Sequence, residues 1–168
     1  HSHYLYFMKH FFIAITLLVA ATFNAHAVVT DSVAYHHQAT DTATIAKILD
    51  ATRKAELEAP ADRLVFAARQ LLRSPYVAAT LEGDTEVLRI NMSEFDCTTL
   101  VETAIALTLT AAVDTASFDE FAQNLRSIRY RSGVVDGYAS RLHYVSDWIA
   151  DNTLRGNFAE VTAQCPLA

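Results

Sequence analysis

The sequence predicts an α+β domain in which a cysteine at the N-terminus of a helix packs on an antiparallel sheet. Two observations lead to this prediction. Apolar residues recur at helical spacing after Cys97. Short segments on either side of that helix alternate apolar and polar residues, as half-buried strands do, and one of them carries His143. Helices followed by strands in this order fit a helical layer packed on a sheet.

Residues 1–27 are predicted to be an N-terminal extension and a secretory signal peptide. Met8-Lys9-His10 is a short basic region, Phe11 to Phe23 is apolar, and Ala25-His26-Ala27 fits an A-x-A cleavage site. The apolar stretch is shorter than the about 20 residues that a bilayer-spanning helix needs. An uncleaved membrane anchor is the alternative. We expect the mature protein to begin at Val28.

Composition narrows the classes of partner. The 168-residue chain has a formal net charge of −6 and is therefore acidic. An acidic exported domain lacks the basic surface that nucleic acids and anionic lipids require, so we expect no nucleic-acid partner and no stable membrane association after signal cleavage. The chain has two cysteines, Cys97 and Cys165. Because exported proteins fold where disulfides form, a disulfide is the alternative to a reactive Cys97.

The mature chain is predicted to open with a polar linker, residues 28–41. His36 and His37 lie in it; adjacent side chains point in different directions, so this pair is a poor metal chelate, and we expect no metal there. The folded domain is expected to span residues 42–168. Helical spacing begins at Thr42, and a second helix is predicted to start at Pro60, because proline suits the first helical turn.

The remaining elements are predicted from local patterns. A strand is expected over residues 86–92, and the Cys97 helix should run to about Val113. Ser117 to Glu120 forms a capping box for a helix through Leu125. Further predicted elements are strands over 127–131 and 141–145, the latter with Arg141, His143 and Val145 on one face, and a helix over 148–154 ended by Gly156.

Cys97 is the candidate nucleophile. Asp96 is a good N-cap, which makes Cys97 the first helical residue, beside free backbone N–H groups and the positive end of the helix dipole. That environment favours the thiolate. A cysteine nucleophile also needs a base. The other histidines lie in the signal region (1, 3, 10 and 26) or the predicted linker (36 and 37), which leaves His143. On spacing alone, a structural histidine remains an alternative.

Three sequence words resemble a known family. Ser74-Pro75-Tyr76, the word from Phe95 to Glu102 (FDCTTLVE) and Arg141-Leu142-His143-Tyr144 together resemble the NlpC/P60 superfamily of papain-like cell-wall cysteine hydrolases. The second word, with the segment from Val134 to Trp148, looks more narrowly like its N-acetylmuramoyl-L-alanine amidase-like branch, also known as domain of unknown function 1460. The resemblance covers residues 63 to 161.

The resemblance implies a role for each matching residue. Cys97 would be the nucleophile, His143 the general base, and Tyr76 the tyrosine that helps to shape the oxyanion site. Asp96 matches a position that contacts the substrate peptide in related endopeptidases, although here it could serve only as a cap. Arg141 could pair with a substrate carboxylate or form an ordinary salt bridge. Four residues are candidates for orienting His143, namely Asp147, Asn157, Glu160 and Gln164.

The function that the resemblance implies is that of an exported bacterial amidase, periplasmic or secreted. It would act on peptidoglycan or muropeptides, cleaving the amide between the muramic acid lactyl group and L-alanine through a Cys–His thioester mechanism, without metal or cofactor. The family domain is longer than this chain, so the domain over 42–168 is expected to be incomplete at its C-terminus. A non-catalytic wall-binding module or a fragment is the alternative.

Overall fold

The computed structural model describes residues 35–159. Several predictions therefore lie outside the described residues: the signal peptide over 1–27, the linker up to residue 34, Glu160, Gln164 and Cys165.

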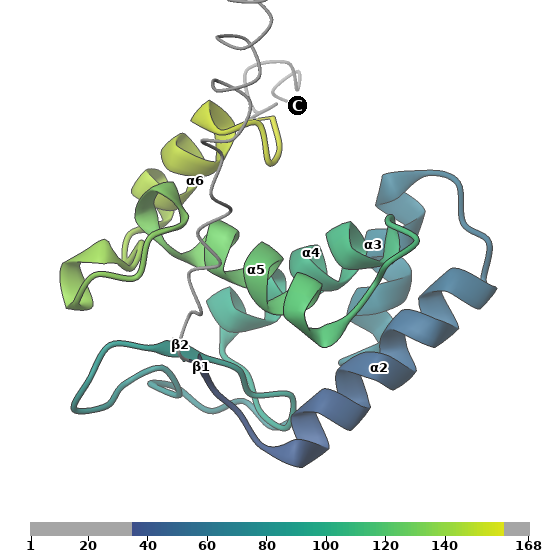
Figure 1. Ribbon diagram of the computed structural model, residues 1–168, viewed down its shortest axis with the longest axis horizontal. Helices are drawn as coiled ribbons and strands as arrows, with labels where there is room; N and C mark the ends of the chain where they lie inside the picture. Colours follow the sequence, from purple (N-terminus) through teal and green to yellow (C-terminus); the bar gives the residue numbers. More distant parts are fainter. Residues whose placement is uncertain (1–34, 160–168) are drawn as a thin grey trace, which may run out of the picture. The chain divides into compact units, whose positions relative to one another are not determined.

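Two central helices, α4 (Cys97–Ala111) and α5 (Phe118–Arg129), pack against each other and hold the core (Figure 1). On one side of them lie α2 (Ala39–Lys54) and α3 (Pro60–Gln70), and on the other lies α6 (Val145–Leu154). The largest fully buried side chains include Ile45, Leu107, Phe121, Leu125 and Ile128. On each helix the buried residues are spaced so that they share one face. The amphipathic helices therefore pack against one another through their apolar faces.

The first two helices follow the sequence pattern with one extension. α3 begins with Pro60 at its first position, as predicted. α2 begins at Ala39, three residues before the predicted start, because the buried Asp41 carboxylate accepts the backbone N–H of Gln38 (2.8 Å). The other oxygen of Asp41 accepts the N–H of Met92 (2.9 Å) and ties α2 to a distant loop. The predicted linker is therefore wrong for residues 35–36, which form a strand, and for residues 39–41, which begin α2.

Apart from isolated bridges, residues 35–159 contain two short strands, β1 (Tyr35–His36) and β2 (Leu88–Arg89), which pair in parallel. The strand predicted over 86–92 is thus confirmed only at its centre. Within the described residues α4 packs against helices rather than on an antiparallel sheet, and the antiparallel pairing there is a single bridge between Tyr130 and Arg141.

The strand predicted over 127–131 is wrong, because α5 continues to Arg129. Ile128 extends the buried face of Phe121 and Leu125 at intervals of four and three residues. Ser117 caps the helix by accepting the N–H of Glu120 (3.1 Å), which is one of the two hydrogen bonds of the predicted capping box. A single-turn helix, η1 (Arg131–Gly133), follows.

The strand predicted over 141–145 is also wrong. After the single-turn helix η2 (Tyr138–Ser140), Arg141 and Leu142 are buried and His143 is exposed, so Arg141 and His143 do not share a face. α6 already begins at Val145 and runs to Leu154; Gly156 follows it with a positive φ of 74°. The helix predicted over 148–154 is confirmed and is three residues longer at its start.

Candidate active site

Cys97 is the first residue of α4 and carries a free, exposed thiol. Asp96 caps the helix: its Oδ1 accepts the N–H of Thr99 (2.7 Å), and the Thr99 hydroxyl accepts the N–H of Asp96 (2.9 Å). The N–H of Leu100 is taken by the Asp96 carbonyl (3.1 Å). Within the described part of the chain, the N–H groups of Cys97 and Thr98 therefore have no partner and are available to an oxyanion. The predicted cap and helix start are confirmed.

Tyr76 lies beside the residues that lead into this helix. Its segment pairs with Phe95 in a parallel bridge, in which the Phe95 N–H donates to the Pro75 carbonyl (3.1 Å) and the Val77 N–H donates to the Phe95 carbonyl (3.0 Å). Tyr76 itself is exposed. The pairing brings the Ser-Pro-Tyr word against the cysteine word, about twenty residues later in the chain.

His143 is exposed and contacts Tyr138. Its Nε2 lies 2.8 Å from the Tyr138 carbonyl oxygen, and its ring stacks on the tyrosine ring with centroids 4.0 Å apart. Two of the residues predicted to orient His143 make other contacts: Asp147 pairs with Arg131 (3.4 Å), and Asn157 donates to Asn152 (2.7 Å).

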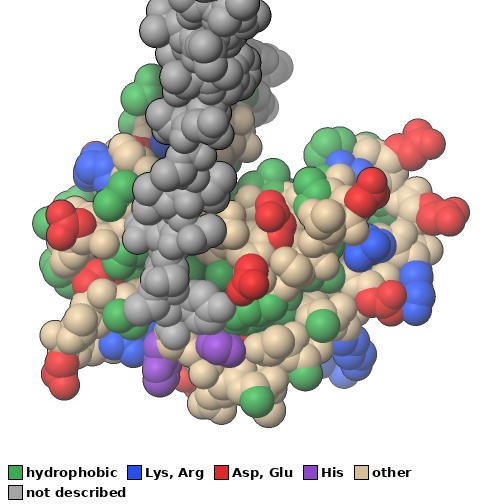
Figure 2. Space-filling model, in the orientation of Figure 1, with side chains coloured by type: hydrophobic (Ala, Val, Ile, Leu, Met, Phe, Trp, Pro, Cys, Tyr) green, Lys and Arg blue, Asp and Glu red, His purple; other side chains and the backbone are tan. Residues whose placement is uncertain are grey.

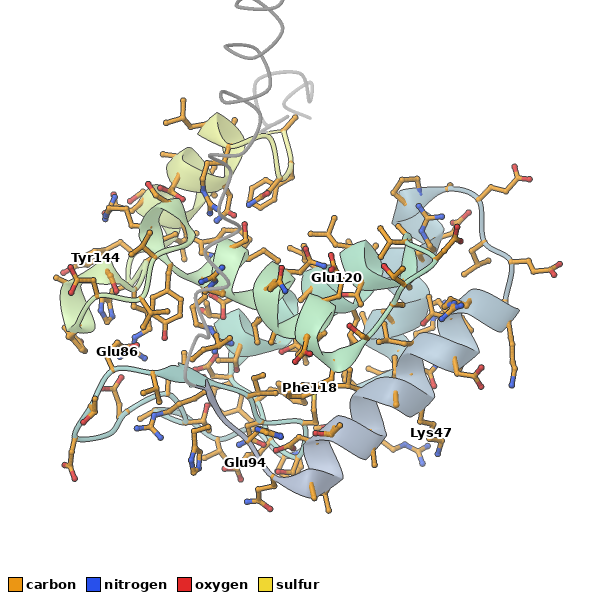
Figure 3. The ribbon with its side chains drawn as sticks, viewed as in Figure 1. Lys47, Glu86, Glu94, Phe118, Glu120 and Tyr144 are labelled. Atoms are coloured by element: carbon orange, nitrogen blue, oxygen red, sulfur yellow. The ribbon has the colours of Figure 1, made fainter. Side chains whose placement is uncertain are left out.

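Arg141 is buried, with 6% of its side chain exposed, and binds carboxylates of this chain. Its guanidinium lies 3.0 Å from Glu82 and 3.5 Å from Glu86. Figure 3 shows Glu86 and Tyr144, which comes three residues after Arg141, on the same side of the structure, away from Lys47 on α2. The salt-bridged alternative for Arg141 is thus present in this structure, and its predicted contact with a substrate carboxylate remains a prediction.

Tyr130 holds Glu86 in place. The buried phenol lies within hydrogen-bonding distance of the Glu86 carboxylate (2.7 Å) and the Val87 carbonyl (3.1 Å). Burial, and then the hydrogen bond to the anionic Glu86, raise the pKa of Tyr130 well above the ordinary value for tyrosine. The phenol therefore remains a neutral donor at physiological pH, and Glu86 is positioned to face Arg141.

A buried ion pair links the histidine segment to the cysteine helix. Arg129 donates through Nε to Glu102 of α4 (2.7 Å) and through Nη1 to the Arg89 carbonyl (2.6 Å), while its own carbonyl accepts the N–H of Leu142 (3.0 Å). Sequence reasoning missed this pair, although a lone Glu102 on an apolar helix was a signal. Within residues 35–159, no hydrogen bond joins Cys97 to His143.

A separate polar pocket of about 140 Å³ lies between the start of α2 and the loop around β2. Its lining includes His36, His37 and Arg89. His36 belongs to β1, and the ring of His37 stacks on Phe118 at 4.7 Å between centroids, so neither residue belongs to a linker. Among the described residues, no group of three or more potential ligands could hold a metal ion, and no helix is long and apolar enough to cross a membrane.

Charged side chains of both signs lie on the visible face of the described residues. Figure 2 shows acidic and basic side chains interspersed over that face, without a broad basic surface.

A family model described as N-acetylmuramoyl-L-alanine amidase-like (AmiA-like) matches residues 66–167, which include Tyr76, Cys97 and His143. The chain belongs to this amidase-like family. No curated protein sequence gave a significant match.

Several solved structures resemble part of this chain. An N-acetylmuramoyl-L-alanine amidase from Bacteroides uniformis is 52% identical over 53% of this chain and 37% of its own, with a TM-score of 0.50. A candidate xylanase from Bacteroides fragilis is 51% identical over 54% of this chain and 40% of its own (TM-score 0.51). A Legionella pneumophila protein of the family called domain of unknown function 1460 is 25% identical over 68% of this chain and 40% of its own (TM-score 0.54). The chain thus spans 37–40% of the length of these relatives.

Proposed function

We propose that this protein is an exported cysteine amidase with a papain-like fold of the NlpC/P60 superfamily. It cleaves the amide between the lactyl group of muramic acid and L-alanine. The observation that supports this most directly is the exposed Cys97 at a capped helix start, within a chain of the amidase-like family. The signal-like residues before Val28 support export to the periplasm or beyond.

In the proposed acylation step, the Cys97 thiol gives its proton to His143, and the sulfur forms a bond with the lactyl carbonyl carbon. The unpartnered N–H groups of the first turn of α4 stabilise the oxyanion, beside Tyr76. The carbon–nitrogen bond then breaks, and the leaving nitrogen takes the proton back from His143. The products are a lactyl thioester on Cys97 and a peptide with a free L-alanine amino terminus.

Hydrolysis of the thioester completes the cycle. Water attacks the thioester carbonyl while His143 accepts a proton, and the proton then returns to the departing sulfur. The carboxylate of the lactyl group is released and the Cys97 thiol is restored. Neither step requires a metal or a redox cofactor, because the nucleophile and the base are both side chains of this chain.

Contacts that connect the helix of Cys97 to the segment of His143 support the proposal. α4 carries Cys97 and Glu102, Glu102 binds Arg129, and the Arg129 carbonyl binds the segment that ends in His143. Because Arg129 and Glu102 are only 3% and 2% exposed, the connection is shielded from water and salt. Substrate binding would then have to bring the two side chains into hydrogen-bonding distance, as catalytic groups in unliganded enzymes often require.

Incubation with N-acetylmuramoyl-L-alanyl peptides and mass analysis of the products tests the proposal. We expect N-acetylmuramic acid and a peptide with a free alanine amino terminus. Cys97→Ser and His143→Ala should each lower turnover by about 10³-fold or more, because nucleophile and base act as one unit. His36→Ala is the matched control, since His36 is an exposed histidine on β1 and should leave turnover unchanged.

Three results would contradict the proposal. Cleavage at a different bond would exclude the amidase specificity. Full turnover in a correctly folded His143→Ala variant would exclude the Cys–His mechanism. Muropeptide binding without any turnover would favour a wall-binding module instead.

A further inference from the structure

We infer that Tyr138 is the positioning residue of His143, and that its backbone carbonyl fixes the imidazole with Nε2 protonated, so that Nδ1 exchanges the proton with Cys97. This inference rests on the proposed function, because it assigns an atom to the base of that reaction. The sequence offered only polar side chains after His143 for this role, whereas the structure shows a residue five positions before it.

The hydrogen bond decides which nitrogen carries the proton. The Tyr138 carbonyl oxygen can only accept, so the Nε2 atom 2.8 Å away must donate. A neutral imidazole has one donor nitrogen and one acceptor nitrogen. Nδ1 is therefore the acceptor, available to take a proton from a thiol. Stacking at 4.0 Å, with the ring planes 31° apart, fixes the remaining rotation of the imidazole.

The turn that carries Tyr138 is held by its own hydrogen bonds. Gly137 has a positive φ of 68°, a conformation that favours glycine. The Ser140 hydroxyl donates to the Gly137 carbonyl (2.7 Å) and accepts the N–H of Asp136 (2.9 Å). The N–H of Arg141 also reaches the Tyr138 carbonyl (3.3 Å). The carbonyl that faces His143 is thus fixed from both sides of the turn.

The Tyr138 ring also has a support. The Arg141 guanidinium lies 5.2 Å from the ring centroid, within cation–π distance, and Glu82 and Glu86 hold that guanidinium in a buried position. Tyr130 in turn holds Glu86. The salt-bridged Arg141 therefore has a function in this arrangement: it fixes the ring on which His143 stacks.

The tautomer can be measured without any substrate. Long-range ¹H–¹⁵N correlation on the full chain with labelled histidine, at about pH 8.5 where histidine side chains are ordinarily neutral, reports which nitrogen is protonated. The His143 signals are those that disappear in His143→Gln. We expect a protonated Nε2 and an unprotonated Nδ1. A protonated Nδ1, or an equal mixture of tautomers, would overturn the inference.

Three tyrosine variants test the positioning role in turnover. Tyr138→Phe keeps both the ring and the carbonyl and should retain turnover within about two-fold. Tyr138→Ala removes the ring and should lower kcat by about 10- to 100-fold with KM nearly unchanged, because only the base is misplaced. Tyr144→Ala is the matched control, since that tyrosine is 73% exposed and does not stack on His143.

The outcomes separate the two proposals. Equal losses in Tyr138→Ala and Tyr144→Ala would overturn the positioning role, as would a mixed tautomer in Tyr138→Phe. If the wild-type chain cleaves no muropeptide, the proposed function fails, while the tautomer measurement still decides whether Tyr138 orients His143.

Discussion

At the scale of single residues, the start of α4 depends on Asp96. Its carboxylate accepts the Thr99 N–H at 2.7 Å and also the Thr99 hydroxyl at 2.9 Å, so one side chain fixes the turn that presents Cys97. The cap thus serves both helix stability and the placement of the thiol. Its other predicted role, contact with the substrate peptide, would compete with these two hydrogen bonds.

Two replacements of Asp96 distinguish the contribution of its capping hydrogen bond to stability from that of its negative charge. Asp96→Ala should lower the free energy of unfolding by about 1 kcal/mol, because the N–H of Thr99 loses its partner. Asp96→Asn keeps a capping oxygen and should remain within a few tenths of a kcal/mol of the wild type. Urea unfolding of both variants measures this. Equal losses in the two would show that the charge matters, and not the cap.

At the scale of elements, three helices are joined by polar contacts across apolar surfaces. The buried Asn152 of α6 donates to the Ile128 carbonyl of α5 (2.9 Å), and Arg129 of α5 binds Glu102 of α4. A buried charge without its partner is costly, whereas a matched apolar pair is not. The α4–α5 ion pair is therefore expected to specify how the two helices meet more than to add net stability.

A double-mutant cycle tests this expectation. Glu102→Leu leaves the Arg129 cation buried and unpaired, and should cost about 3–5 kcal/mol. The double variant with Glu102→Leu and Arg129→Met should recover most of that loss, although the Arg89 carbonyl then lacks its donor. Chemical denaturation measures all four proteins. Additive losses would show that the two residues act independently.

At the scale of the whole domain, the features predicted correctly from the sequence are helix starts, which depend on only a few neighbouring residues. Asp96, Pro60 and Ser117 mark helix starts correctly, because a cap or a proline acts on the turn that follows it. The alternation of Ile128 and Tyr130 was misread as a strand, because the choice between strand and helix there depends on burial against distant residues.

For the candidate site, the sequence predicts individual residues, and their catalytic roles stay predictions. Cys97, His143 and Tyr76 follow from sequence words, and the bridge between Tyr76 and Phe95 places two of those words together. The partner of His143 could not be predicted, because a backbone carbonyl has no signature in the sequence. Gly137, whose positive φ shapes the turn before Tyr138, was the one available signal.

Alkaline pH should destabilise the whole domain through Tyr130. The pKa of Tyr130 is raised in the folded state, first by burial and then by Glu86, whereas in the unfolded chain it is about 10. Below pH 10 both states hold the proton, and the contribution of Tyr130 to stability is complete. As the pH rises above 10, the unfolded chain releases the proton and the folded chain keeps it. The free energy of unfolding therefore falls, by at most about 1.4 kcal/mol per pH unit for this group.

Tyr130→Phe should remove that part of the pH dependence, because phenylalanine has no proton to release. It should cost about 1 kcal/mol at neutral pH, since Glu86 loses a hydrogen bond. Above pH 10 the wild-type curve should fall more steeply than the variant's, so the two approach each other. Tyr144→Phe is the matched control, because it removes an exposed phenol instead of a buried one, so its curve should follow the wild type. Parallel curves for wild type and Tyr130→Phe between about pH 9 and 11 would show that Tyr130 ionises as readily in the folded domain as in the unfolded chain.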